Sequence, residues 1–285
     1  MKQESFSFEF FPPKTQKGVE SLASVRKTLA ELNPDFFSVT YGAGGSTQDS
    51  TKNTVIQTQA ETGIPTASHL SCVGSSEEHI RSILNTYQKH NINRLVALRG
   101  DLPSGMRDLG DFQHANDLVE FIRKETGDYF QIEVAAYPEM HPQADNYQTD
   151  IENFARKANA GADRAITQYF YNTDAYFYFV DSVRKAGVEI PILPGIMPIT
   201  NFSNLARFSD GTGAEIPRWL RKRLEGYADD NDSIEKLGLE FVTKMCDRLL
   251  QGGAPGLHFY TMNKLEPSIS IWKALGLSDA QRSED

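Results

Sequence analysis

The feature that most constrains the fold is a regular alternation of strand-sized apolar segments with stretches of helical periodicity. Eight apolar segments recur along the 285 residues, and most are rich in β-branched or aromatic side chains. They span Phe6–Phe11, Phe36–Tyr41, Thr66–Cys72, Arg94–Arg99, Ile132–Tyr137, Arg164–Phe170, Ile192–Met197 and Leu257–Met262. Between them, apolar residues spaced i, i+3, i+4, i+7 predict amphipathic helices, as at Ile80, Ile83, Leu84 and Tyr87.

Strands that alternate with helices predict a parallel sheet. Eight such units without a linker rich in Pro, Gly or Ser favour a closed (β/α)8 TIM barrel over an open, doubly wound sheet. We expect a single α/β domain over residues 1–285, with an extra helical segment, Ser233–Leu250, before the last strand. A hydrophobic content of 39% with 24% charged residues is ordinary for a chain that builds a sizeable core.

Charge and composition argue against several classes of function. The net charge is −9 and no Lys/Arg-rich run is present, so a nucleic-acid partner is not expected. No apolar run is long enough for a membrane span, and an apolar strand begins too early for a signal peptide. Two cysteines, Cys72 and Cys246, are too few for a disulfide framework or a closed zinc site. We expect a cytoplasmic protein with no metal site and no membrane association.

Polar residues stand at the ends of most of the expected strands. In this barrel, the active site lies where the carboxyl ends of the strands and the following loops meet. The polar residues there should therefore converge on one mouth: Glu9, Thr40 and Tyr41, His69, Arg99 with Asp101, Tyr137 with Glu139 and His141, Gln168, and Tyr260.

Glu9 is the first candidate for catalysis. Period-two alternation places Phe6, Phe8 and Phe10 on one face of the strand and Glu9 on the other, pointing into the barrel. A poorly solvated carboxyl group among aromatic side chains should have a raised pKa, which suits a general acid. The alternative is a buried structural carboxylate paired with Arg99 or a lysine.

Three further clusters are ambiguous when each is taken alone. Leu98–Pro103 could hold a flat ligand close to the Gly100 backbone, or could form a salt-bridged turn. In Ala135–Pro142, small side chains leave space inside the barrel, and Tyr137 and His141 supply aromatic rings. A lone histidine such as His141 is more often structural than functional, and no metal-ligand spacing accompanies it. Gly42–Thr47 could bind phosphate through its backbone, yet it matches neither GxGxxG nor a P-loop.

The order of these clusters along the chain carries more information than any one of them. The motifs follow one another at the spacing of single β/α units: Phe8–Lys14, Ser38–Ala43, His69–Cys72, Ala97–Asp101, Ala136–Pro142, Gly161–Gln168, Pro194–Pro198 and His258–Asn263. This succession resembles the methylenetetrahydrofolate reductase family over nearly the whole chain. The resemblance is to the compact bacterial form, which has no added regulatory domain.

The resemblance implies tightly bound FAD at the barrel mouth, with NADH or NADPH as co-substrate. It assigns cofactor contacts to Thr40, Tyr41, Ala43, His69, Arg99, Gly100, Asp101, His114, Ala115, Tyr137, His141, Ala144, Asp150, Asn153, Arg156 and Lys157. The adjacent cations Arg156 and Lys157 suit a pyrophosphate. Without the resemblance, Arg156 and Lys157 would be interpreted as part of an ordinary solvent-exposed helix edge.

The resemblance also implies a ping-pong reduction of 5,10-methylenetetrahydrofolate to 5-methyltetrahydrofolate, which supplies methyl groups for methionine synthesis. Glu9 would protonate the bridging amine, and Asp101 would hydrogen-bond the folate and adjust the flavin's electronics. Substrate contacts are expected from Gln168, Phe202, Tyr260 and Lys264. A homo-oligomer is expected, and NADH is favoured over NADPH.

Three positions depart from the family pattern: His114 replaces a common Tyr, Gln143 replaces a frequent Glu, and Lys264 stands where Arg also occurs. Two other functions stay open from the sequence. One is another flavin barrel, such as a proline-dehydrogenase-like oxidase of small amines. The other is a catalytically silent folate- or flavin-binding barrel that serves as an assembly subunit.

Overall fold

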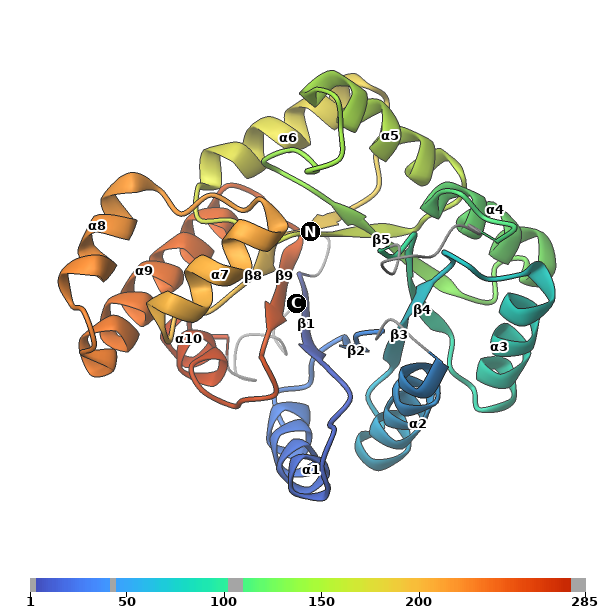
Figure 1. Cartoon of the computed structure of the whole chain (residues 1–285), viewed down its shortest axis with the longest axis horizontal. Helices are drawn as coiled ribbons and strands as arrows, with labels where there is room; N and C mark the ends of the chain where they lie inside the picture. The colour runs from blue at the N-terminus through green and yellow to red at the C-terminus, as the bar shows by residue number, and fades with distance from the viewer. Residues whose placement is uncertain (1–3, 42–44, 102–109, 278–285) are drawn as a thin grey trace.

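The structure of the chain is a computed structural model that describes residues 4–41, 45–101 and 110–277. Parallel strands form a central ring, and helices surround it (Figure 1). The strands are β1 Ser5–Phe10, β2 Phe36–Val39, β3 Thr66–Ser71, β4 Arg94–Leu98, β5 Gln131–Ala136, β6 Arg164–Thr167, β7 Ile192–Leu193, β8 Gly195–Ile196 and β9 Gly256–Tyr260.

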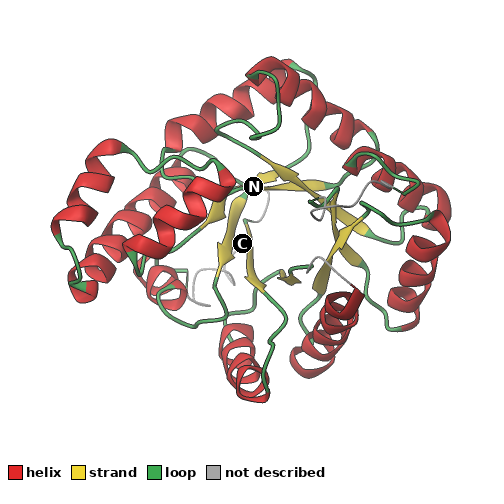
Figure 2. Ribbon diagram, viewed as in Figure 1, coloured by secondary structure: helices red, strands yellow, loops and turns green. Residues whose placement is uncertain are grey.

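The seventh strand of the barrel is divided by Pro194 into β7 and β8. Proline has no backbone N–H to give to a ladder, so the regular pairing is interrupted at this residue. β7 pairs with β6 and β8 pairs with β9, and together they close the ring (Figure 2). The Pro194 carbonyl accepts a hydrogen bond of 3.0 Å from the His258 N–H. The expected (β/α)8 barrel is confirmed.

The helices are α1 Gln16–Ala30, α2 Gly45–Thr62, α3 Glu77–Lys89, α4 Ala115–Thr126, α5 Tyr147–Asn159, α6 Thr173–Lys185, α7 Phe202–Thr212, α8 Arg218–Gly226, α9 Asn231–Gln251 and α10 Ser268–Ala274. The extra helical segment expected before the last strand is α9. Two further helices, α7 and α8, precede it and were not identified from periodicity. None of the described helices has both the length and the apolar character that crossing a membrane requires.

Local sequence explains where several helices begin. The side chains of Thr15, Ser76, Asn146 and Asn201 each accept a hydrogen bond from a backbone N–H in the first turn of α1, α3, α5 and α7. Such N-caps satisfy donors that have no partner within the helix and stabilise it by about 1 kcal/mol each.

The alternation in β1 divides its side chains between two environments. Phe6 and Phe8 face outward, where the ring of Phe6 lies 5.2 Å and that of Phe8 5.6 Å from the ring of Trp272. Ser7 and Glu9 face the interior, where both contact His258. The expectation that Glu9 points into the barrel is confirmed.

Side chains fill the barrel interior beneath the site. An apolar cluster from five strands crosses it: Phe36, Ala67, Val96, Ile166 and Leu193. At the amino-terminal ends of the strands, Arg94 Nη1 lies 2.8 Å from Glu133 Oε1. Burial raises the pKa of Glu133 to about 7 despite the attraction of Arg94. This packing leaves the carboxyl ends of the strands as the open face of the barrel.

Candidate active site

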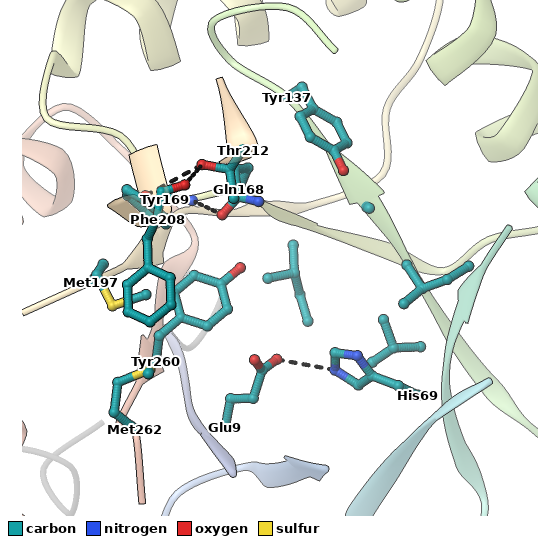
Figure 3. Close-up of a pocket in the computed structure, with 14 residues that line it drawn as sticks. Glu9, His69, Tyr137, Gln168, Tyr169, Met197, Phe208, Thr212, Tyr260 and Met262 are labelled. Atoms are coloured by element: carbon teal, nitrogen blue, oxygen red, sulfur yellow. Dashed lines mark hydrogen bonds and ion pairs between the residues drawn. The ribbon is translucent and has the colours of Figure 1, made fainter. Parts of the chain in front are cut away.

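A cavity of about 300 Å³ opens at the carboxyl ends of the strands, and we call it the mouth cavity. Five of the predicted site residues line it together: Glu9, His69, Tyr137, Gln168 and Tyr260. They come from or directly follow β1, β3, β5, β6 and β9, and Figure 3 shows Glu9, His69 and Tyr260 grouped on one side. Apolar side chains supply much of the remaining wall: Val96, Leu98, Ala135, Ile166, Met197, Phe208 and Met262.

The Glu9 carboxylate is held through one oxygen. Its Oε2 lies 3.0 Å from Nε2 of His69 and 3.3 Å from Nε2 of His258. The Ser38 hydroxyl donates to the same oxygen at 3.3 Å. Nε2 of His69 is buried and makes no aligned hydrogen bond, and at 3.0 Å from Oε2 it forms an ion pair with Glu9 when the ring is protonated (Figure 3).

His258 is fully buried and was not predicted as a site residue. Its Nδ1 lies 2.7 Å from Oγ of Ser7, which neighbours it across the β1–β9 ladder. Nε2 faces a carboxylate oxygen and therefore carries a hydrogen, so in the neutral ring Nδ1 accepts from the Ser7 hydroxyl. Ser7 and His258 thus anchor Glu9 from below. The period-two pattern was the available signal, because it places Ser7 with Glu9 and His258 with Tyr260.

The pKa of Glu9 differs from the sequence prediction. Burial raises it, as expected, but the charges of His69 and His258 and their close contacts with the carboxylate together outweigh burial. The pKa is lowered to about 2, so the predicted raised pKa is wrong. The sequence alternative of a partner in Arg99 or a lysine is also corrected, since the partners are histidines from β3 and β9.

Tyr260 and Gln168 complete the polar wall of the mouth cavity. The Tyr260 hydroxyl donates to the Thr167 carbonyl at 2.7 Å, and burial raises its pKa well above the ordinary value. Gln168 Oε1 accepts from the Tyr169 N–H at 2.9 Å. The amide NH2 of Gln168 is then the group able to donate to a ligand.

The aromatic ring that α7 contributes to the mouth cavity belongs to Phe208, not to the predicted Phe202. Phe202 begins α7 and packs against the core, with the Arg221 guanidinium 5.9 Å from its ring centre. Phe208 is 36% exposed and is the more accessible ring. The Tyr169 hydroxyl lies 3.1 Å from Oγ of Ser209, which fixes this part of α7 against the β6 loop.

A second cavity of about 560 Å³, the side cavity, lies between the β4, β5 and α5 regions. It gathers nine of the predicted cofactor residues: Arg99, His114, Ala115, His141, Ala144, Asp150, Asn153, Arg156 and Lys157. Asn116 and Gln143 complete its lining. The sequence pattern alone could not show that these separated segments share one cavity.

Charge in the side cavity is concentrated on α5. Lys157 Nζ donates to the Ala135 carbonyl at 2.5 Å, and burial lowers its pKa to about 8. Arg156 contacts the side-chain oxygen of Asn153. Asp150 accepts from the His141 N–H at 2.9 Å and holds that loop against the helix. A cavity with buried and exposed cations beside amide groups suits a phosphate-bearing ligand.

Gly100 follows β4 and packs closely against Ser71, the last residue of β3. Gly100 has φ +83°, and a Cβ atom there would lie 1.8 Å from Oγ of Ser71, so glycine is required. Asp101 follows it and is exposed, and it lines neither cavity.

The remaining predicted residues lie at the edges of this arrangement. Thr40 and Tyr41 directly follow β2, at the same end of the barrel as Glu9. Lys264 is exposed in the turn after β9, and it lines neither cavity. Ala43 is outside the described residues.

Comparison with known proteins gives the family. The methylenetetrahydrofolate reductase family model matches residues 1–276. The chain belongs to this family. The 5,10-methylenetetrahydrofolate reductase of Escherichia coli is 39% identical over 275 residues, which cover 96% of this chain and 92% of that protein. Methylenetetrahydrofolate reductase (NADH) 1 of Arabidopsis thaliana is 40% identical over 293 residues, and the chain spans 50% of its length.

Solved structures agree on the fold. An uncharacterised Clostridium thermocellum protein that binds two copies of 5-methyl-5,6,7,8-tetrahydrofolic acid superposes with a TM-score of 0.65 at 17% identity, covering 97% of this chain and 96% of that one. Oxaloacetate acetylhydrolase gives a TM-score of 0.53 at 10% identity, covering 95% and 79%. At these identities the likeness concerns the barrel alone.

Proposed function

We propose that this protein reduces 5,10-methylenetetrahydrofolate to 5-methyltetrahydrofolate with NADH or NADPH, through FAD. One observation carries the proposal: a buried carboxylate, Glu9, is held by two histidines in an otherwise largely apolar cavity. This carboxylate can transfer a proton to or from a flat substrate that enters the cavity. Membership of the reductase family supports the assignment of methylenetetrahydrofolate as the substrate. Methionine synthesis is the expected use of the methyl group.

The side cavity fits the phosphate and adenosine parts of FAD. Lys157 and Arg156 supply positive charge for the diphosphate, and Asn153 and Asp150 supply polar contacts for the rest. The Tyr137 ring lines the mouth cavity and His141 lines the side cavity, with ring centroids 4.4 Å apart. FAD, when bound, accepts a hydride from the nicotinamide and passes it to the folate.

The residues of the chain bind the folate and handle its proton. Glu9 is ionised in the free site, so it would first take up a proton, beside the bridging amine, and then transfer that proton to the nitrogen whose bond to the methylene carbon breaks. Gln168 would donate from its amide, and Phe208 would stack on a flat ring in the place first assigned to Phe202. The apolar wall would exclude water from the reacting atoms.

Asp101 and Lys264 have supporting roles in the proposal. Asp101 follows Gly100, whose backbone packs against Ser71 at the end of β3, and its carboxylate would hydrogen-bond the folate. Lys264, exposed beside the mouth, would attract the carboxylates at the folate's tail. Thr40 and Tyr41, which directly follow β2, would contact the cofactor, and the family resemblance gives Ala43 the same role. NADH as the favoured reductant and a homo-oligomeric state stay predictions.

Product identification tests the proposal. Purified protein, FAD, NADH and methylenetetrahydrofolate should yield 5-methyltetrahydrofolate, identified by mass spectrometry, with NADPH tested in parallel. Glu9→Gln should slow product formation by about 10²-fold or more, as expected for loss of general acid catalysis. Oxidation of a small amine without folate turnover would favour the proline-dehydrogenase-like alternative. Flavin binding with no turnover of either substrate would favour the assembly subunit.

A further inference from the structure

Glu139 lies in the loop after β5 and lines neither the mouth cavity nor the side cavity, so the proposed reaction gives it no role. We propose that Glu139 is a positioning residue that places the Phe208 ring for the folate, by binding the segment after α7 to the loop after β5. The same loop carries His141, which lines the side cavity. The role of Phe208 rests on the proposed function, whereas the contact made by Glu139 does not.

The Glu139 carboxylate joins two segments that are distant in the sequence. Its Oε2 accepts a hydrogen bond of 2.8 Å from the N–H of Glu215, 76 positions further along the chain. Its Oε1 is buried and, within the described part of the chain, has no hydrogen-bond partner. Burial raises the pKa of Glu139 to about 7, although the hydrogen bond from Glu215 acts in the opposite direction. The carboxylate has thus given up solvent for one backbone N–H, and removing its oxygens would disconnect the two segments at this point.

The two segments also pack closely beside this hydrogen bond. A Cβ atom added at Gly213, which directly follows α7, would lie 3.1 Å from Cγ of Pro142 in the loop after β5. Residues of both segments line a remaining cavity of about 10 Å³, which is no larger than one water molecule. Ala214 and Ile216, on either side of Glu215, are both buried. The segment after α7 is therefore seated on the loop after β5.

Phe208 lies near the end of α7 that Glu139 holds. α7 ends at Thr212, one turn after Phe208, and both side chains line the mouth cavity. Tyr169 also holds this end, since its hydroxyl lies 3.1 Å from Oγ of Ser209 and 3.3 Å from Oγ1 of Thr212 (Figure 3). Tyr169 follows β6, so it relates α7 to a different strand. The Glu139 contact is what relates the position of Phe208 to the loop after β5.

The opposite end of α7 is fixed by other contacts. The side chain of Asn201 caps this end of the helix, and its Nδ2 donates to Oδ1 of Asn231 at 3.1 Å. Leu205 is buried in the core. Loss of the Glu139 contact should therefore displace the end of α7 that bears Phe208 while the helix itself persists.

A double-mutant cycle between Glu139 and Phe208 tests the proposal on the holoenzyme with NADH. Glu139→Ala should raise the KM for methylenetetrahydrofolate about fivefold, as expected for loss of stacking by Phe208, with kcat within about twofold. In the Phe208→Ala background, the same substitution should add less than about twofold, because no ring is left to place. Glu139→Gln should keep a KM near the wild-type value, since its amide oxygen can accept from the Glu215 N–H.

Asp35→Ala is the matched control for this cycle. The Asp35 carboxylate also accepts from the backbone N–H of a distant segment, that of Phe6 at 2.7 Å, but at the amino-terminal ends of β1 and β2. Its loss should lower stability and leave the KM unchanged. An unchanged KM in Glu139→Ala, or increases that multiply in the double variant, would overturn the proposal. An equal rise in Glu139→Gln and Glu139→Ala would also overturn it, because the acceptor oxygen would then not be what matters.

Hydrogen exchange gives a readout that needs no folate. In the wild-type holoprotein the Glu215 amide should be protected, and Glu139→Ala should speed exchange over residues 208–216 about tenfold while α3 exchanges as before. A Glu215 amide that is unprotected in the wild type would overturn the proposal even if Glu139→Ala does not fold, and protection kept in Glu139→Ala would do the same. A wild type that does not reduce the folate would instead contradict the proposed function, and the exchange rates would still decide whether Glu139 holds α7.

Discussion

The rings of Tyr137 and His141 meet edge to face, with centroids 4.4 Å apart. Tyr137 lines the mouth cavity and His141 lines the side cavity, so this pair lies where the two sites adjoin. A ligand that extends from one cavity to the other must pass beside it. The proposed dinucleotide cofactor would extend past this pair, with its phosphates held by the residues of α5 in the side cavity.

Phe208 and Phe202 provide a matched pair for the substrate site. We expect Phe208→Ala to raise the KM for methylenetetrahydrofolate about fivefold, since stacking on a flat ring contributes about 1 kcal/mol and is lost with the ring. Phe202→Ala should lower stability, because its ring packs against the core, with less effect on KM. Steady-state kinetics of both variants make the comparison. Equal changes in KM would contradict the assignment of Phe208.

Lys157 should make cofactor binding depend on pH. Burial lowers its pKa to about 8, so the side chain is charged below this value and loses its charge as the pH rises. Titration of the apoprotein with FAD should show weaker binding at pH 9 than at pH 7. Lys157→Met should bind about tenfold more weakly at pH 7, since a charge-assisted contact is lost. FAD binding by this variant should also depend less on pH. An identical pH dependence in the variant and the wild type would argue against a phosphate contact by Lys157.

Alanine substitutions at Gly100 and Gly187 distinguish backbone strain from steric clash as causes of lost stability. Both have positive φ, +83° and +82°, but a Cβ atom at Gly187 has no neighbour within 4 Å. Gly187→Ala should cost about 1 kcal/mol of unfolding free energy from backbone strain. Gly100→Ala adds a clash with Ser71 and should cost about 1–3 kcal/mol more, with weaker FAD binding. Urea denaturation of both variants measures the difference, and equal losses would show that the space at Gly100 is not limiting.

Replacement of Ser7 tests whether its hydrogen bond to His258 helps to hold the Glu9 carboxylate in place. Ser7→Ala removes the donor to His258 Nδ1 and leaves a buried acceptor without its partner. We expect a loss of about 1–3 kcal/mol in unfolding free energy. Folate-driven flavin reoxidation should slow while reduction by NADH stays near the wild-type rate, because only the carboxylate loses its support. Equal slowing of both half-reactions would indicate a general disturbance of the barrel.

Much of the fold could be predicted from the sequence because the signals are local. Alternation in β1 placed Glu9 inside the barrel, and apolar spacing indicated helices such as α3 and α5. The division of the seventh strand at Pro194 was not foreseen, since a short apolar run looks continuous until the missing N–H is considered. The short helices α7 and α8 lack a long apolar stripe and were missed for that reason.

The site was harder to predict because its decisive contacts join distant segments. His258 meets Glu9 across 249 positions of sequence, through a strand register that composition does not reveal. The pKa of Glu9 follows from histidines on β3 and β9, whereas the burial that its own segment suggests would act in the opposite direction. Phe208 and Phe202 lie on one short helix, and only its packing shows which ring faces the cavity.

The most direct test of the proposed reaction is an anaerobic absorbance titration of the purified protein with NADH and then methylenetetrahydrofolate. We expect the yellow band of bound flavin to bleach with NADH and to return when the folate is added, which would establish both half-reactions on one protein. Bleaching without recovery would leave the cofactor assignment standing and remove the folate as substrate. Failure to bind flavin even with added FAD would contradict the account as a whole.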